Sequence, residues 1–424
     1  MTSIPPLPAA PRTGHTLRRS ESTPVSYLVG GARGVQSLRA LNLERILDVV
    51  MAQPGSFTRP QLIRATGLSA PTVGSLVAQL ERRGLVRDLG PGPSSGGRRP
   101  SFMELNARYG FIAGIDLGPT KTRIAVADLR GERLAHRVLP TPGGVGPTAL
   151  LERVAKAVRA LLEEARVPYD RLLAVGAGAP GAVSPQSGEV RLAPNLRGWN
   201  RVPMGRILGR ALDVPVVVEN DVNLAVLGER WQGAARGHDT CAFITVGTGI
   251  GAGVVVNGDL HRGHHSLAGE IGLMCMGPQF VDRDFGERGC LETLAGLQAL
   301  ARRWPRAARG DPESWLSDLF EAAERGERAA QRAVGEAARL IGIATANLSL
   351  VIDPSLVVLG GAMVTHGPAL VREVRRVVER LVPTPTDIVV SGLGKEAPLW
   401  GSLLIADREA RARLRQELRD ERLA

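Results

Sequence analysis

Two glycine-bearing turns place the strongest constraint on how this chain can fold. The first lies in Gly114–Thr122 and the second in Gly247–Gly251, about 130 residues further on, and each joins two apolar runs typical of β-strands. Helix-like and strand-like runs alternate through this part of the chain. The alternation predicts an α/β fold, and the repeated strand, turn and strand predict two similar lobes with a nucleotide-binding cleft between them.

Both turns carry the residue types of a phosphate-binding loop. A glycine turn lets backbone N–H groups approach a phosphate closely, and nearby threonine or lysine side chains add donors. Either turn alone is a weak signal, but they open matching halves, and a further glycine pair follows a later strand-like run. The predicted nucleotide- or phosphate-binding residues are Asp116, Gly118, Thr120, Lys121, Thr245, Gly247, Thr248, Gly249, Gly360 and Gly361.

A separate helical pattern precedes the two lobes. Apolar residues recur at helical spacing, Thr58 and Gln61 form a capping box for a second helix, and Ser69 can cap a third helix that continues to about Arg83. Two strand-like runs joined by a glycine-rich segment follow. Three helices and a two-stranded wing predict a winged helix-turn-helix domain over residues 37–108.

The positive charge of the chain is concentrated in this N-terminal part. The net charge is +11, and residues 1–108 hold 14 Arg against 6 Asp or Glu, a net +8. Such an excess favours nucleic acid, although a solvated face and a basic tail would produce the same count. In a winged helix-turn-helix the third helix enters the major groove and the wing reaches phosphates. The predicted DNA-binding residues are Ala70, Thr72, Ser75, Gln79, Arg98 and Arg99.

The remaining composition indicates a soluble protein of the cytoplasm. Residues 1–36 are rich in Pro, Ser, Gly and Arg without a sustained period, which predicts a disordered tail. No apolar run reaches the roughly 18 residues that span a membrane, and no signal-peptide pattern opens the chain. Cys241, Cys275 and Cys290 form a sparse, odd set, which favours a reducing compartment over a disulfide framework.

The order of motifs resembles that of the ROK family (repressors, open reading frames and kinases), within the actin-like sugar kinase superfamily. The resemblance extends over about residues 38–410, and it implies an actin-like (ribonuclease H-like), two-lobed sugar kinase fold for residues 109–424. The N-terminal module resembles the DNA-binding head that some members carry. The motifs that carry the resemblance are SSGGRRP (94–100), GIDLGPTKT (114–122), PNLRGW (194–199), VEND (218–221), GTGIG (247–251), HRGHHSLAGEIGL (261–273) and GCLET (289–293).

The resemblance also implies a sugar site between the lobes. Asp221 is implied as the general base that takes the proton from the attacking hydroxyl, because phosphoryl transfer needs alignment, charge neutralisation and one proton acceptor. For a single aspartate after a strand, the alternative is a helix cap. The implied sugar-binding residues are Asn195, Glu219, Asn220, Asp221, Glu270 and Glu292.

Two departures from the family pattern bear on cofactors. Pro119 replaces the second glycine of the family's D-x-G-G-T-K loop, and because proline lacks an N–H, one phosphate donor is lost. The positions that correspond to the family's structural zinc ligands hold Leu273, Arg283, Phe285 and Cys290, so the usual tetrahedral site cannot form. We therefore expect no resident metal. A rearranged site made by Cys275, Cys290 and His264 or His265 is the alternative.

Three functions are compatible with these patterns. The favoured one is a sugar-responsive transcriptional regulator, a repressor, that binds operator DNA as a homodimer or homotetramer, binds a sugar or sugar phosphate, and requires no cofactor or membrane. The second is an active ATP-dependent hexose kinase that uses ATP and Mg²⁺ and carries a DNA-binding head; Asp221, Thr120 and Lys121 keep this alternative open. The third is a transcription factor whose body is only a scaffold, which would not need the polar set implied at the sugar site.

Overall fold

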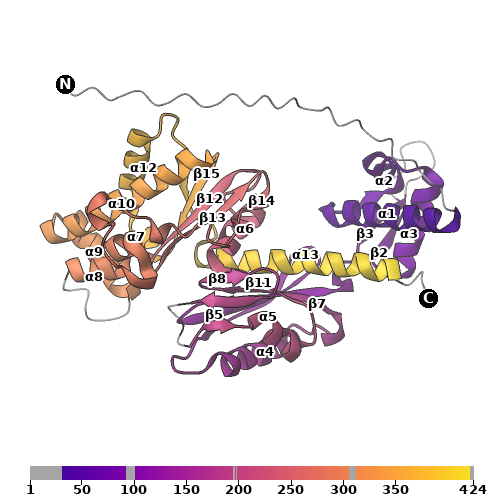
Figure 1. The fold of residues 1–424 in the computed structure, drawn as a ribbon. Helices are drawn as coiled ribbons and strands as arrows, with labels where there is room; N and C mark the ends of the chain where they lie inside the picture. The colour runs from indigo at the N-terminus through magenta and orange to yellow at the C-terminus, as the bar shows by residue number, and fades with distance from the viewer. Residues whose placement is uncertain (1–30, 92–100, 194–195, 197, 305–311, 421–424) are drawn as a thin grey trace, which may run out of the picture.

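The computed structural model describes residues 31–91, 101–193, 196, 198–304 and 312–420. They form a small N-terminal head and a body of two α/β lobes, the N-lobe and the C-lobe (Figure 1). This architecture confirms the predicted winged helix-turn-helix followed by a two-lobed body.

The head contains three helices and a small sheet of order β1-β3-β2. As the capping box predicts, Gln61 Oε1 accepts a hydrogen bond from the Thr58 N–H at 2.7 Å. Ser69 caps the third helix by accepting from the Thr72 N–H at 3.4 Å. The elements of the head are α1 (Gly31–Ala52), β1 (Phe57–Thr58), α2 (Arg59–Thr66), α3 (Ala70–Arg82), β2 (Val86–Pro91) and β3 (Ser101–Leu105).

The first helix differs from the sequence prediction. Residues 31–36 were expected in the disordered tail, but α1 begins at Gly31. Once a helix is nucleated, each added residue gains a backbone hydrogen bond, so a helix can extend over weak helix formers. The strand β1, which pairs with β3, is two residues long and has no periodic signal in the sequence.

The N-lobe is built on a five-stranded sheet of order β11-β7-β4-β5-β6. Strands β4, β5 and β6 form an antiparallel meander, whereas β7 and β11 run parallel to β4. Helices α4 and α5 contribute to an apolar core with this sheet. The elements are β4 (Phe111–Leu117), β5 (Lys121–Asp128), β6 (Arg133–Pro140), α4 (Pro147–Glu164), β7 (Leu172–Ala179), β8 (Ala182–Ser184), β9 (Glu189–Leu192), β10 (Asn200–Val202), α5 (Met204–Leu212) and β11 (Val216–Asn220).

The C-lobe repeats this layout. Its sheet has the order β14-β13-β12-β15-β16, with an antiparallel meander joined to two parallel strands. The strand order is that of the N-lobe, with β12 in the place of β4, which confirms the two similar halves. The elements are β12 (Cys241–Val246), β13 (Ile250–Val256), β14 (Asp259–Leu260), α7 (Gly289–Ala295), α8 (Leu297–Arg303), α9 (Pro312–Glu324), α10 (Arg328–Ile352), β15 (Leu356–Gly360), α11 (Ala362–His366), α12 (Pro368–Leu381) and β16 (Asp387–Val390).

One described helix, α10, is long and apolar enough to cross a membrane by length and composition. The sequence predicts a helix over residues 329–353, which α10 confirms, but no uninterrupted apolar run, because charged residues such as Arg332 and Arg339 interrupt its apolar residues. Half of its most apolar window is buried inside the protein. The buried side chains belong to the apolar core of the C-lobe, as is common for a central helix of an α/β domain.

Two helices, α6 (Asp221–Gln232) and α13 (Ala397–Asp420), join the lobes. Helix α13 packs on α6 and on strands β4 and β7 of the N-lobe. This approach needs glycine: a Cβ at Gly176 would lie 1.9 Å from the Ser402 carbonyl oxygen, and one at Gly401 would lie 1.9 Å from the Leu224 carbonyl oxygen. Figure 1 shows α13, in yellow, running from between the lobes to the head.

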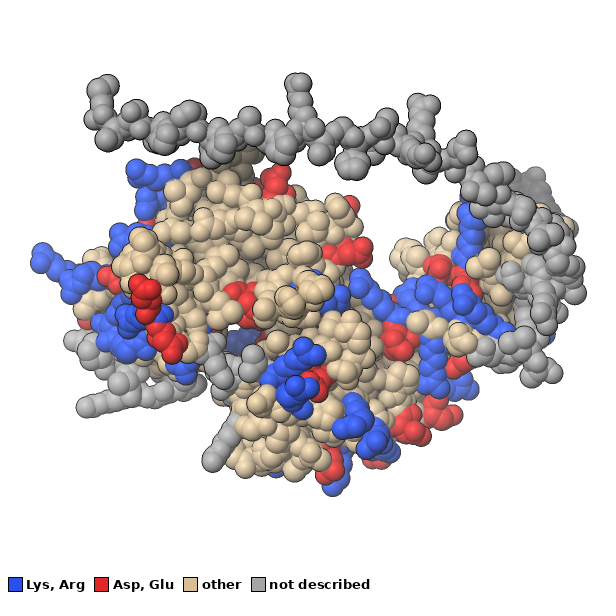
Figure 2. Space-filling view, in the orientation of Figure 1, with Lys and Arg blue, Asp and Glu red and all other residues tan. Residues whose placement is uncertain are grey.

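The far end of α13 docks on the head. Leu414 and Leu418 belong to one continuous apolar cluster with the core of the head. Arg415 Nε lies 3.0 Å from Asp48 Oδ1, and Arg419 Nη2 lies 2.7 Å from Glu44 Oε2. Basic and acidic side chains gather at this junction (Figure 2). The head is therefore attached to the body through α13 as well as through the chain itself.

We predict that apolar contact dominates this docking. Leu418 is 2% exposed, so Leu418→Ala should destabilise the head by about 2–5 kcal/mol. The Arg415–Asp48 pair is partly exposed, so Arg415→Gln should cost less than about 1 kcal/mol. Native-state hydrogen exchange of α1 and α3 amides measures both effects. Equal effects of the two substitutions would contradict this ranking.

Candidate functional site

Four carboxyl groups from both lobes lie close enough to interact. Asp116 lies near the end of β4, Asp221 is the first residue of α6, Glu270 precedes a short 3₁₀ turn, and Glu292 lies in α7. Their charges interact: Asp116 and Glu270 each raise the pKa of Asp221, and Glu270 raises that of Glu292. The structure thus brings together Asp221, Glu270 and Glu292 of the predicted sugar site with Asp116 of the first glycine turn.

Asp221 has the most altered proton affinity of the four. Burial raises the pKa of its carboxyl to about 7, the negative charge of Asp116 adds to the increase, and the Val222 N–H opposes it. One carboxylate oxygen accepts a hydrogen bond from that N–H at 2.9 Å. A carboxyl group with a pKa near neutrality is suited to accept a proton from a bound hydroxyl.

Asp116 pairs with an arginine that the sequence analysis did not single out. Arg123 lies opposite Asp116 in the β4–β5 hairpin, and its Nη1 is 3.1 Å from Asp116 Oδ2. Burial raises the pKa of Asp116 to about 6, although the Arg123 guanidinium favours its charged form. The hairpin register was the signal that could have identified Arg123, because it places the two side chains opposite each other.

Asn220, and not Asp221, caps helix α6. Its Oδ1 accepts hydrogen bonds from the backbone N–H groups of Val222 and Asn223, at 2.9 and 3.0 Å, and its Nδ2 donates to the Gly181 carbonyl oxygen at 3.0 Å. The cap alternative considered for Asp221 therefore applies to its neighbour. The Asn220 side chain holds the strand–helix junction that presents Asp221 to the cleft.

Glu219 is buried and bonded to the protein. Its Oε1 accepts from the Asn220 N–H at 2.8 Å and from Asn223 Nδ2 at 3.0 Å, and its Oε2 accepts from Arg262 Nε at 2.7 Å. Arg262 was not among the predicted site residues, and no local pattern connects it to a residue 43 positions earlier. The direct sugar contact predicted for Glu219 stays a prediction.

Glu270 and Glu292 differ in their hydrogen bonds. Glu292 Oε2 accepts from the Ile250 N–H at 3.0 Å, which ties α7 to the second glycine turn. In the part of the chain that the structure describes, the Glu270 carboxylate accepts no hydrogen bond from protein. Burial raises the pKa of both groups. Glu270 is therefore free to accept hydrogen bonds from a ligand.

The glycine turns lie in the two lobes as predicted. In the first, the Gly118 N–H donates to the Lys121 carbonyl oxygen at 3.0 Å, and the intervening Pro119 and Thr120 are exposed. In the C-lobe, a Cβ at Gly361 would lie 2.5 Å from the Val246 carbonyl oxygen, so the later glycine pair lies against the second turn. The remaining predicted phosphate-binding residues lie in these segments: Gly118 and Lys121 in the first, and Thr245, Gly247, Thr248, Gly249 and Gly360 in the second.

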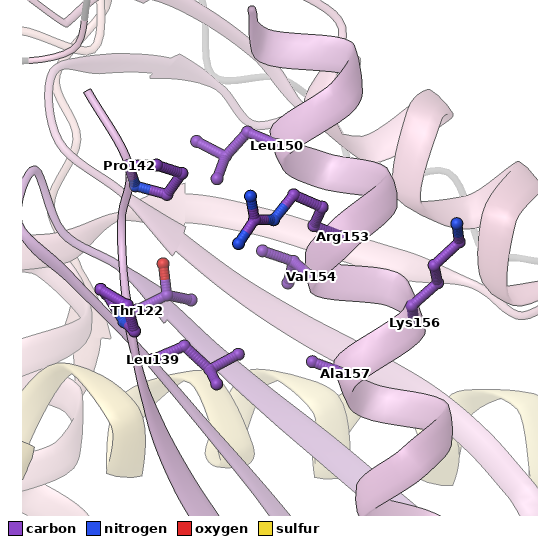
Figure 3. Close-up of a pocket in the computed structure, with 9 residues that line it drawn as sticks. Thr122, Leu139, Pro142, Leu150, Arg153, Val154, Lys156 and Ala157 are labelled. Carbon is purple, nitrogen blue, oxygen red and sulfur yellow. The ribbon is translucent and has the colours of Figure 1, made fainter. Parts of the chain in front are cut away.

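A cavity of about 270 Å³ lies elsewhere in the N-lobe (Figure 3). It is lined mainly by apolar side chains of β6 and α4, with Thr122 of β5 and with Arg153 and Lys156 of α4. None of the predicted site residues lines this cavity. The carboxyl cluster is therefore separate from this cavity.

No group of three or more His, Cys, Asp or Glu suited to a metal ion occurs among the described residues. Cys290 is buried, and its Sγ accepts from the Met276 N–H at 3.5 Å, whereas Cys275 is exposed. Leu273 is 49% exposed at the position of the family's metal-binding histidine. The expectation of no resident zinc stays a prediction.

The third helix of the head, α3, exposes to solvent the face that carries the predicted DNA-binding residues. Ala70 and Ser75 are exposed and Thr72 and Gln79 are partly exposed, while the opposite face of α3 is buried. Ser75 Oγ accepts from Arg39 Nη2 at 3.2 Å. Three predicted site residues lie outside the described residues: Arg98, Arg99 and Asn195.

Comparison with known proteins agrees with this arrangement of head and body. A xylose repressor of Caldicellulosiruptor bescii is 30% identical over 353 residues, which cover 81% of this chain and 87% of the relative. A glucokinase of Thermotoga maritima is 31% identical over 311 residues, which cover 69% of this chain and 96% of the relative.

Two solved structures are similar to this fold. A ROK family transcriptional regulator, described as a homologue of the E. coli MLC protein, has a TM-score of 0.74 at 21% identity and covers 91% of this chain and 99% of its own. A ROK hexokinase from Thermus thermophilus has a TM-score of 0.62 at 35% identity and covers 71% of this chain and 99% of its own.

Family patterns match both parts of the chain. Residues 45–99, in the head, match the MarR family. Residues 112–409, which contain the carboxyl cluster and all three glycine-bearing segments, match the ROK family. The match extends over more than half of the chain and over both lobes, so the protein belongs to the ROK family.

Proposed function

We propose that the protein is a sugar-responsive transcriptional repressor, whose head binds operator DNA and whose cleft binds the effector. The observation that carries this proposal is helix α13, which contacts α6 beside the cleft at one end and pairs with the head through Arg415 and Arg419 at the other. Relatives named xylose repressors align over a larger share of this chain than relatives named glucokinases, which supports the same function.

The chemistry of the cleft favours a neutral sugar as the effector. Carboxylates accept hydrogen bonds from hydroxyl groups, and the Glu270 carboxylate has no protein donor among the described residues. Among the described residues, the Arg123 guanidinium acts on Asp116 and that of Arg288 acts on Glu292, but no positive charge lowers the pKa of Asp221 or Glu270. A sugar phosphate would add negative charge to this cluster, so we place it second to the unphosphorylated sugar.

An ATP-dependent hexose kinase is the second candidate, supported by the pKa of Asp221 near 7. In such an enzyme Thr120, Lys121 and the C-lobe glycines would hold the nucleotide. The first turn fits this role poorly, because Pro119 supplies no N–H and Arg123 already pairs with Asp116. Our proposed function therefore requires neither ATP nor Mg²⁺.

We propose that the sugar acts on the head through the relative position of the lobes. A sugar held between Asp221 on α6 and Glu270 of the C-lobe would favour one lobe separation, and α13 packs on α6. In a dimer, a shift of α13 would change the spacing of the two heads. Coupling of this kind typically amounts to about 1–3 kcal/mol, roughly a 5- to 150-fold change in operator affinity.

Replacement of both wing arginines, Arg98 and Arg99, by Ala should weaken operator binding across sequences. The salt dependence of binding should also flatten, by roughly one unit for each lost phosphate contact. Fluorescence anisotropy at several salt concentrations measures both quantities. Arg325→Ala, on an exposed arginine of the C-lobe, is the matched control. Unchanged affinity and slope in the double variant would exclude the wing from DNA binding.

Glu270→Ala should abolish the effect of sugar on operator binding, whereas Asp221→Asn should preserve most of it. The amide of Asn keeps the shape and a hydrogen bond of Asp221 but cannot act as a base. Both variants are titrated with D-xylose and D-glucose without ATP. Calorimetry measures sugar binding, and an operator-binding assay measures the effect of the sugar on DNA affinity. Turnover with ATP near the ~10 per second of ordinary enzymes, lost in Asp221→Asn, would identify the chain as a kinase instead.

Asp221→Asn should also stabilise the fold, more at pH 8 than at pH 5. The folded-state pKa of Asp221 is raised from 3.8 to about 7, so the stability associated with its protonated form is lost as pH rises through 7. The gain at pH 8 should be on the order of a few kcal/mol. Urea unfolding at both pH values measures it. A larger gain at pH 5 would show that the carboxyl is not destabilised by its buried, acidic surroundings.

A further inference from the structure

We propose that Arg262 is a positioning residue of the sugar site, which acts by locking the sugar-binding loop of the C-lobe to the N-lobe through Glu219. The inference rests on the proposed function, because it assigns how the two halves of the sugar site are held in position relative to each other. The motifs VEND, which contains Glu219, and HRGHHSLAGEIGL, which contains Arg262, do not predict that these two residues form an ion pair.

The ion pair crosses from one sheet to the other. Glu219 lies in β11, at the edge of the N-lobe sheet, and Arg262 is the second residue after β14, at the edge of the C-lobe sheet. Arg262 Nε is 2.7 Å from Glu219 Oε2. The Glu219 side chain is 4% exposed, and its other oxygen accepts from Asn220 and Asn223. The distance between Arg262 and Glu219 therefore depends on the position of one lobe relative to the other.

Arg262 begins the loop that ends in Glu270. The loop is closed on itself, since the Ala268 N–H donates to the Arg262 carbonyl oxygen at 3.1 Å. Its far end is fixed to β13, where the Ala252 N–H donates to the Gly269 carbonyl oxygen at 2.7 Å. Gly269 has a φ of +93°, and a Cβ there would lie 1.9 Å from the Ala252 carbonyl oxygen. The far end of the loop is therefore anchored to the C-lobe.

The partner of Arg262 is adjacent to the sugar residues of the N-lobe. Glu219 bonds the Asn220 N–H, and Asn220 caps the helix that begins at Asp221. One ion pair thus connects the segment that carries Glu270 to the segment that carries Asp221. A ligand that bridges these two carboxyl groups and an ion pair that bridges the same two segments favour the same lobe separation, so their strengths must be coupled.

Arg262 also lies near the helix that reaches the head. Burial and the positive charge of Arg230 lower the pKa of Arg408 on α13, with a smaller contribution from Arg262, while Asp259 and Asp407 oppose the decrease. Arg230 and Arg262 therefore lie near Arg408 of α13. Glu219 neutralises the charge of Arg262, so Glu219→Gln would leave an additional positive charge near this helix.

The test is a double-mutant cycle on sugar affinity in the full-length protein. D-xylose and D-glucose are the probes, and calorimetry measures their Kd. We expect Arg262→Gln to raise the Kd by about tenfold or more, since it removes a hydrogen bond to a charged, buried group. Arg262→Lys should recover part of the affinity. Once Glu219 is Gln, a further Arg262→Gln should have little additional effect, because the pair is already broken.

The matched control is Arg133→Gln. Arg133 Nη1 lies 2.8 Å from Glu396 Oε2, and this pair joins β6 to the segment before α13, away from the carboxyl cluster. The two arginines have similar exposure, 26% for Arg133 and 37% for Arg262, whereas Glu396 is 38% exposed and Glu219 4%. We expect this substitution to leave the Kd of the sugar unchanged. Thermal unfolding of each variant, measured without sugar, separates a change in sugar affinity from a general loss of stability.

Two results would overturn the inference: a wild-type Kd in Arg262→Gln, or a cycle in which the two substitutions have independent effects. If wild-type protein binds neither sugar, the proposed function fails for these ligands, but the positioning role is still tested by hydrogen exchange. Arg262→Gln should then speed exchange of the amides in residues 263–270, and Arg133→Gln should not. Equal exchange rates in wild type and Arg262→Gln would exclude a positioning role for the Arg262–Glu219 ion pair, whether or not a sugar binds.

Discussion

The packing of α13 against the N-lobe is the constraint on which the rest of the structure depends. Helix α13 approaches β7 and α6 so closely that a Cβ at Gly176, Gly228 or Gly401 would lie about 2 Å from a backbone oxygen of the neighbouring element. Any side chain at these positions would push α13 away from β7 or α6. Because the same helix then extends to the head, a displacement at the body would be carried to the docking contacts with α1. Three glycines therefore set the geometry of the whole molecule.

The cleft illustrates the conflict between stability and function. Asp221 lies in a partly enclosed position beside Asp116 and Glu270, where burial and like charges raise its pKa to about 7. A fold selected for stability alone would not gather carboxyl groups in this way. Such an arrangement is useful if the groups accept hydrogen bonds from a ligand. It argues against a body that acts only as a scaffold, for which these polar groups would be a cost without a benefit.

The departures from the family pattern lie on the nucleotide side of the cleft and at the family's zinc position. Pro119 removes an N–H from the first glycine turn, and Leu273, Arg283 and Phe285 stand at three of the four zinc-ligand positions. The sugar side keeps its carboxyl groups, and the Glu219–Arg262 pair joins them across the two sheets. A protein that senses a sugar needs the carboxyl groups of the sugar side, and it can lose groups that hold a nucleotide. This asymmetry supports a regulator more strongly than a kinase.

The sequence alone determined the elements whose signals are local. The capping residues Thr58, Gln61 and Ser69, the apolar face of α3 and the two glycine hairpins depend on neighbours within a few positions, so their pattern could be read directly. Only the tertiary structure decided which distant side chains meet. Arg262 pairs with a residue 43 positions away, and Arg415 with one 367 positions away. Such contacts depend on the order of strands in two sheets and on the path of α13, which no local periodicity encodes.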